Sequence, residues 1–71
     1  MSTFGLALPL RIEVAEESVS VVDAAGVRAF YVYTCAEPER RRNTKRLSPE
    51  NGVAVAKIAA RALTDQIERG E

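Results

Sequence analysis

Apolar and polar residues alternate over two short stretches near the start of the chain. In LRIEVA the apolar residues stand at every second position, and SVSVV repeats the same period of two. This alternation is typical of a strand with one buried face. It predicts strands near residues 9–15 and 18–23, after a loosely held segment over residues 1–8.

A turn sequence connects the second predicted strand to a third. DAAG has Asp23 at its first position and Gly26 at its last, where a left-handed backbone is common. VRAFYVYT follows directly. The sequence therefore predicts a hairpin that leads into a strand near residues 27–34.

This third strand is apolar on both faces. Phe30 and Val32 point to one side, whereas Tyr31 and Tyr33 point to the other. One helix covers only one face of a small sheet, so the other face needs a cover, and a second copy of the chain is the nearest candidate. We expect these four residues to form the self-association face of a homodimer. The alternative is that the tyrosines lie on the surface with their hydroxyl groups in water.

The second half of the chain carries the pattern of one amphipathic helix. Ser48 is a good N-cap and Pro49 fits the first helical position. Gly70 ends the pattern, so the helix is predicted near residues 49–68, and Gly52 should weaken its first turn. The expected inner face consists of Val55, Ala56, Ile58, Ala59, Ala62, Leu63 and Ile67.

These elements combine into a single α+β domain over residues 1–71. A three-stranded antiparallel β-meander packs one face on one C-terminal helix (βββα), and residues 36–47 form a basic connection between sheet and helix. The hairpin register decides which sheet face meets the helix, because a shift of one residue exchanges the two faces.

Composition limits what can stabilise so small a domain. The chain has 71 residues, of which 46% are hydrophobic and 28% charged, as is usual for a folded chain. Cys35 is the only cysteine and histidine is absent, so we expect no disulfide, no structural metal and no cofactor. Stability must then come from apolar packing, extended by a second subunit.

The chain shows no segment suited to a membrane. Its longest uncharged stretch is ten residues long, over residues 1–10, and lacks the basic start of a secretory signal. We therefore expect no membrane association and a cytoplasmic location, which a lone thiol fits.

A run of basic residues precedes the predicted helix. It comprises Arg40, Arg41, Arg42, Lys45 and Arg46. Such a run beside a helix start can bind the phosphates of a nucleic acid, or pair with carboxylates of a protein partner. However, three acidic residues lower the net charge of residues 37–50 to +2, and the sequence pI is about 6.3, whereas nucleic-acid-binding domains are usually basic. We expect a solvated rim, with nucleic-acid binding as the alternative.

No arrangement of residues points to catalysis. A nucleophilic Cys35 would need a nearby base, and the usual partner, histidine, is absent. The neighbouring carboxylates at positions 16 and 17, and at 37 and 39, show no partner that would tune one acid against the other. P-loop, dinucleotide-binding and zinc-binding patterns are also missing. We expect a protein without enzymatic activity.

Three segments, VVDAAGVRAFYVY, PERRRNTKRLSPE and VAKIAARAL, together resemble a group of small hypothetical proteins from rhizobia and related alphaproteobacteria. The shared features are the D-x-x-G hairpin, the Tyr-x-Tyr strand end, the Pro-x-Arg-Arg segment and the Leu-Ser helix start. The resemblance covers residues 18–63. It implies a folded domain and carries no activity with it.

Two functions are consistent with these features. The first is a small interaction module that acts as a homodimer or binds a protein partner through the exposed sheet face or its edge. The alternative is a nucleic-acid-binding domain in which the basic run contacts phosphates.

Overall fold

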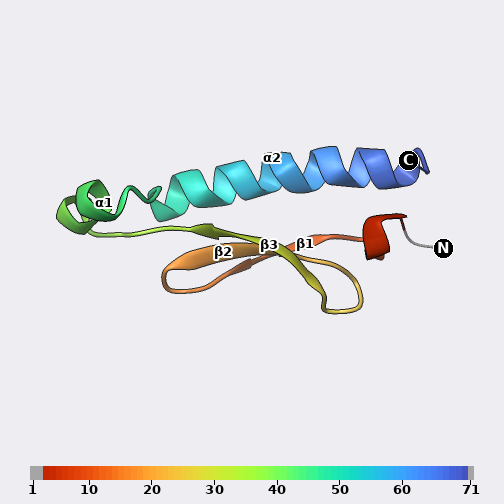
Figure 1. Ribbon diagram of the computed structural model, residues 1–71, viewed down its shortest axis with the longest axis horizontal. Coiled ribbons are helices and arrows are strands. Elements are labelled where there is room, and N and C mark those ends of the chain that lie inside the picture. The colour runs from red at the N-terminus through yellow and green to blue at the C-terminus, as the bar shows by residue number, and fades with distance from the viewer. Residues whose placement is uncertain (1–2, 71) are drawn as a thin grey trace.

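The computed structural model describes residues 3–70 and contains a single sheet. Its elements, in chain order, are a 3-10 turn η1 (Thr3–Gly5), strands β1 (Arg11–Val14), β2 (Ser18–Val22) and β3 (Arg28–Tyr33), and helices α1 (Pro38–Thr44) and α2 (Pro49–Glu68). Figure 1 shows α2 lying along the sheet, with α1 beyond the end of the strands. The predicted α+β fold, with three antiparallel strands before a C-terminal helix, is confirmed.

The strand register settles which sheet face meets the helix. The strands lie in the order β1-β2-β3, and both neighbouring pairs are antiparallel. Val19 pairs with Val32 and Val21 with Phe30, so these four side chains share one face. Beyond Val21 the register shifts at a β-bulge.

The core lies between this face and α2. At its centre Val19 and Val21 pack against Ala56 of the helix. The partly buried residues around them are Leu10, Ile12, Phe30, Val32, Val53 and Ala60. Phe30 and Val32 therefore face the helix, and Tyr31 and Tyr33 lie on the opposite side of the sheet.

The face of α2 that meets the sheet differs from the predicted one. Val55 and Ile58 were expected inside, but they are 45% and 72% exposed, and Ala62 is exposed as well. The buried residues of the helix are Gly52 and Ala56. Because glycine has no side-chain carbon and alanine only a methyl group, the helix backbone can approach the sheet closely. Apolar residues cover more than half of the helix circumference, so their pattern alone did not identify the inner face. Of the remaining predicted inner residues, the partly buried ones are Ala59, Leu63 and Ile67.

The start of α2 is built as predicted, with one difference at Gly52. The Ser48 side chain accepts a hydrogen bond of 3.2 Å from the Asn51 backbone N–H, and Pro49 occupies the first helical turn. Gly52 was expected to weaken this turn, but it is buried, and a Cβ atom there would collide with Cγ2 of Thr34. The glycine thus permits a close contact between the helix and the end of the sheet.

The basic connection contains a helix that the sequence pattern did not predict. Helix α1 ends at Thr44, and the C-cap residue Lys45 that follows has a left-handed backbone with φ of 56°. Arg41 holds the helix in place, because its guanidinium donates to the carbonyl oxygens of Cys35 at 2.9 Å and Ala36 at 3.1 Å. After α1 the chain returns to the sheet, where the Cys35 N–H donates to the Leu47 carbonyl at 2.8 Å.

The N-terminal segment is attached to the hairpin rather than loosely held. Residues 1 and 2 lie outside the described part of the chain, but Leu6 is buried. The Ala7 N–H donates to Oδ2 of Asp23 at 2.9 Å, and the Ala24 N–H donates to the Ala7 carbonyl at the same distance. The start of the described chain is therefore bound to the turn between β2 and β3.

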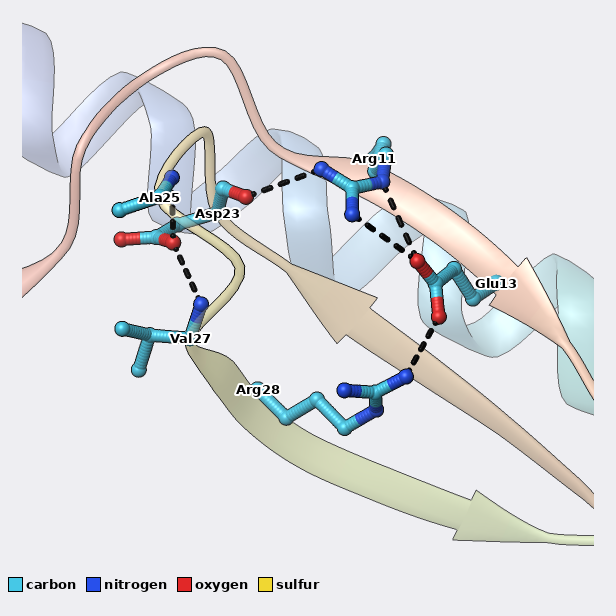
Figure 2. A network of polar contacts seen from close by, with 6 residues as sticks. All are labelled: Arg11, Glu13, Asp23, Ala25, Val27 and Arg28. Carbon is cyan, nitrogen blue, oxygen red and sulfur yellow. Dashed lines mark hydrogen bonds and ion pairs between the residues drawn. The ribbon is translucent and has the colours of Figure 1, made fainter.

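Asp23 also organises the turn itself, as its position in DAAG predicted. Its Oδ1 accepts hydrogen bonds from the backbone N–H groups of Ala25 and Val27, at 2.9 and 2.8 Å (Figure 2). Gly26 has a φ of 91°, a left-handed conformation that favours glycine. The hydrogen bond from Ala7 and those from Val27 and Ala25 lower the pKa of the Asp23 carboxyl below its ordinary value, although burial opposes them.

Candidate interaction surface on the sheet

Two tyrosines form the centre of the sheet face that points away from α2, called here the outer face. The rings of Tyr31 and Tyr33 stack with centroids 6.2 Å apart and planes at 12°. They are 51% and 60% exposed. Their partners on β2 are Ser20 and Ser18, whose small side chains leave room for the rings. The structure thus presents a flat aromatic surface to the solvent.

An arginine from the basic run extends this aromatic surface. The guanidinium carbon of Arg46 lies 5.4 Å from the ring centroid of Tyr33, a distance typical of a cation–π contact. Arg46 reaches this position because the chain returns from α1 to the end of β3. Such a contact between residues distant in sequence could not be predicted from the local pattern.

On the same outer face, three charged residues form an ion-pair bridge between the two edge strands. Glu13 of β1 accepts from Arg11 at 3.0 Å and from Arg28 at 2.7 Å (Figure 2). Arg11 also donates to the Asp23 carbonyl at 3.1 Å. These exposed pairs contribute little stability individually, but they fix the orientation of charges beside the tyrosines.

Most of the basic run is already engaged within the chain. Arg40 pairs with Glu17 at 2.8 Å, and this hydrogen bond raises the pKa of Arg40. Arg41 binds backbone carbonyls, and Arg46 lies on Tyr33 and 3.9 Å from Glu17. Within residues 3–70, Arg42 and Lys45 make no ion pair. The structure therefore does not gather the five basic side chains on one surface free of acidic partners.

The self-association residues are divided between the two faces of the sheet. Tyr31 and Tyr33 lie on the outer face, whereas Phe30 and Val32 lie against the core and are only partly buried. A surface made by all four side chains together is thus not present. Tyr31 and Tyr33 remain candidates for self-association through the outer face. Phe30 and Val32 remain candidates for self-association through the edge of the sheet.

Cys35 and the neighbouring carboxylates lie at the opposite end of β3 from the hairpin. Cys35 is 1% exposed, and its thiol is 3.6 Å from the Glu37 carbonyl oxygen. A shallow hollow beside it is lined by Glu16, Glu17, Ala36, Glu37 and Arg40. Among residues 3–70 no three metal-ligating side chains come together.

Comparisons with known proteins assign no relationship to the chain. No family model matches it, and no curated protein or solved structure does. The resemblance to small proteins of rhizobia therefore stays a prediction. In the described part of the chain, neither helix is both long and apolar enough to cross a membrane.

Proposed function

We propose that the protein is a non-enzymatic interaction module that associates with a second copy of itself through β3. The observation that supports this most directly is the stacked, half-exposed pair of Tyr31 and Tyr33 with Arg46 beside it. Tyrosine and arginine are enriched among the residues that contribute most to protein interfaces. A tyrosine side chain also loses little conformational freedom when a partner covers it, because it has only two rotatable side-chain bonds.

The small size of the core gives a physical reason for association. Within residues 3–70 the buried apolar side chains are few: Leu6, Val19, Val21, Val22, Cys35 and Ala56. The fold is elongated, 45 × 19 × 14 Å, so much of its apolar surface remains in contact with water. A second subunit would bury part of this surface and so stabilise a chain of only 71 residues. We place the module in the cytoplasm, where a lone thiol stays reduced.

The first test is the mass of the protein in solution. We expect the wild-type chain to sediment as a dimer at micromolar concentration. Tyr31→Ser and Tyr33→Ser should each weaken the dimer at least tenfold, which corresponds to a loss of about 1.4 kcal/mol of binding free energy.

Ile58→Ser serves as the matched control for these variants. Ile58 is 72% exposed and lies on α2, away from the outer face of the sheet, so this substitution also replaces an exposed apolar residue with serine. It should leave the dimer unchanged. A wild-type protein that is monomeric up to millimolar concentration would contradict the proposed function.

Nucleic-acid binding is a second candidate, favoured by one specific observation. Tyr33 with Arg46 is the kind of platform on which single-stranded bases stack, and Arg42 and Lys45 carry charge nearby in the chain. Against this, Glu17 neutralises Arg40 and approaches Arg46. Titration with a single-stranded oligonucleotide and with random duplex DNA at two salt concentrations decides between the candidates. Salt-sensitive binding that Arg42→Ser and Tyr33→Ser both weaken would favour the nucleic-acid function.

A further inference from the structure

The hydrogen bonds of the first hairpin show which backbone groups of β1 point away from the sheet. The Ala15 N–H donates to the Ser18 carbonyl at 2.8 Å, and from there β1 pairs with β2 without a register shift. In an antiparallel pair, residues that bond to the partner strand alternate with residues whose N–H and C=O groups point outward. Counting back from Ala15, the odd-numbered residues of β1 bond to β2. The backbone groups of Ile12 and Val14 point outward, and no hydrogen bond or bridge within residues 3–70 occupies them.

The same alternation extends one step before β1, to Leu10. The side chains of Leu10 and Ile12 both pack against the core. The Arg11 side chain between them bonds to Glu13 on the outer face (Figure 2). Side chains that alternate in this way belong to an extended segment. Residues 10–14, called here the edge segment, therefore present the outward backbone groups of Leu10, Ile12 and Val14.

The neighbouring parts of the chain leave the edge segment uncovered. The strand order places β1 at one side of the sheet. The chain before it turns toward the side of β1 that carries β2, because Ala7 bonds to Asp23 and Ala24. Pro9 has no N–H, but it falls at a position that faces β2, so it removes no outward donor. Val14, at the end of the segment, is 63% exposed. The edge thus combines unpaired backbone groups with an uncovered apolar side chain.

We propose that the edge segment pairs antiparallel with the edge segment of a second copy, with Ile12 opposite Ile12 on the two-fold axis. In this register the outward groups of Val14 meet those of Leu10 of the second copy, so every outward group of the edge segment gains a partner. The proposal goes beyond the proposed function, because it adds a contact between copies on the side of the sheet opposite β3.

The charges of the edge segment complement each other in this register. Arg11 of each copy comes opposite Glu13 of the other, in the closely spaced pairs of the new ladder. A register centred on Glu13 would instead place two carboxylates directly opposite each other, which is unfavourable. A register centred on Val14 would set Ile12 against Glu16 of the first turn. The charges therefore favour a second copy, in one register, as the occupant of this edge.

The apolar side chains also fit, on the inner face of the sheet. Val14 comes opposite Leu10 of the second copy, so the exposed valine is covered, and the two Ile12 side chains meet on the axis. Helix α2 packs over Val19 and Val21 of β2, one strand in from the edge. The two helices therefore lie on the same face with the axis between them. The result is one continuous sheet of six strands, three from each copy.

Nuclear Overhauser effects between two copies test this register directly. The Tyr31→Ser variant is used, because it weakens association through the outer face and lies on the strand farthest from the edge segment. In a mixture of labelled and unlabelled protein at near-millimolar concentration, the Hα atoms of Arg11 and Glu13 should show an intermolecular contact, because these residues form a closely spaced pair. Within one chain the two atoms are two residues apart on an extended strand, too far for this signal.

Two charge variants in the same background provide the matched perturbation. Arg11→Glu makes both charges of the edge segment negative, and Glu13→Arg makes both positive. Each variant alone places like charges opposite each other at two symmetric positions, so its dissociation constant should rise at least about tenfold. An equimolar mixture restores opposite charges and should associate at least about tenfold more tightly than either variant. Val14→Asp should also weaken the pairing, whereas Val55→Asp, which changes an exposed valine of α2, should not.

The outcomes separate this proposal from the proposed function. The Arg11–Glu13 contact together with preferential association of the mixed charge variants supports the edge pairing, and the absence of either result overturns it. If both results appear but Tyr31→Ser does not weaken the wild-type assembly, the edge pairing stands and the proposed function fails. If Tyr31→Ser weakens the assembly but neither result appears, the proposed function stands alone. A chain that stays monomeric at millimolar concentration overturns both.

Discussion

At the scale of single residues, Gly52 shows how one position can be favourable in the folded protein and unfavourable in a helix. Glycine weakens a helix interior by up to about 1 kcal/mol relative to alanine. Here it lies against Thr34, where any Cβ atom would meet the threonine methyl group. Helix propensity was visible in the sequence, whereas this contact joins residues 18 positions apart. The close packing of α2 on the sheet therefore depends on a residue that local rules count as a defect.

Gly52→Ala should lower the free energy of unfolding by about 1–3 kcal/mol, because the added methyl group overpacks a buried contact. Thr34→Ser removes the methyl group of Thr34 that causes the collision. In this second background Gly52→Ala should be neutral or should stabilise the protein by up to about 1 kcal/mol. Urea unfolding of the two single variants and the double variant measures this coupling. An equal cost of Gly52→Ala in both backgrounds would show that Thr34 is not the obstacle.

At the scale of elements, the hairpin between β2 and β3 holds the N-terminal segment through one carboxylate. Asp23 accepts from Ala25 and Val27 in the turn and from Ala7 outside it. The role of Asp23 in the turn could be predicted, because aspartate at the first turn position commonly bonds the backbone two residues later. The bond to Ala7 could not be predicted, because it spans 16 residues.

The lowered pKa of Asp23 makes this attachment sensitive to acid. A carboxyl group whose pKa falls on folding stabilises the protein above its ordinary pKa of 3.8, and this contribution is lost as the pH falls through the lower folded value. Asp23→Asn keeps one acceptor oxygen but loses the other, so the variant should be less stable at neutral pH. Its stability should also depend less on pH below about 4. Thermal unfolding from pH 7 to pH 2 compares the two slopes, and parallel curves would contradict the prediction.

At the scale of the whole molecule, the small core and the elongated shape are the features that the proposed assembly would compensate. Of the buried apolar side chains of the described residues, only Val19, Val21 and Ala56 form the cluster between the sheet and α2. The outer face with Tyr31 and Tyr33 remains exposed in a single copy. If the dimer forms as proposed, folding and association are linked, and the stability of the chain rises with its concentration.

The thermal midpoint of the wild-type protein should therefore increase with concentration. Each tenfold increase adds about 1.4 kcal/mol to the stability of the dimer, so the midpoint should rise by several degrees across two decades. In the Tyr31→Ser variant the midpoint should be lower than in the wild-type protein at each concentration within the same range. Calorimetry at three concentrations provides the measurement, and a wild-type midpoint independent of concentration would argue against linked association.

The sequence by itself determined the local features of this protein. Alternation at a period of two indicated the strands, DAAG the hairpin, and Ser48 with Pro49 the start of α2, because each depends on residues a few positions apart. The tertiary structure decided the rest. It set the helix face that packs on the sheet, the need for Gly52, the helix within the basic run and the placement of Arg46 on Tyr33. Each of these depends on distances between residues far apart in the chain, which are fixed only when the sheet register and the path of the connection are known.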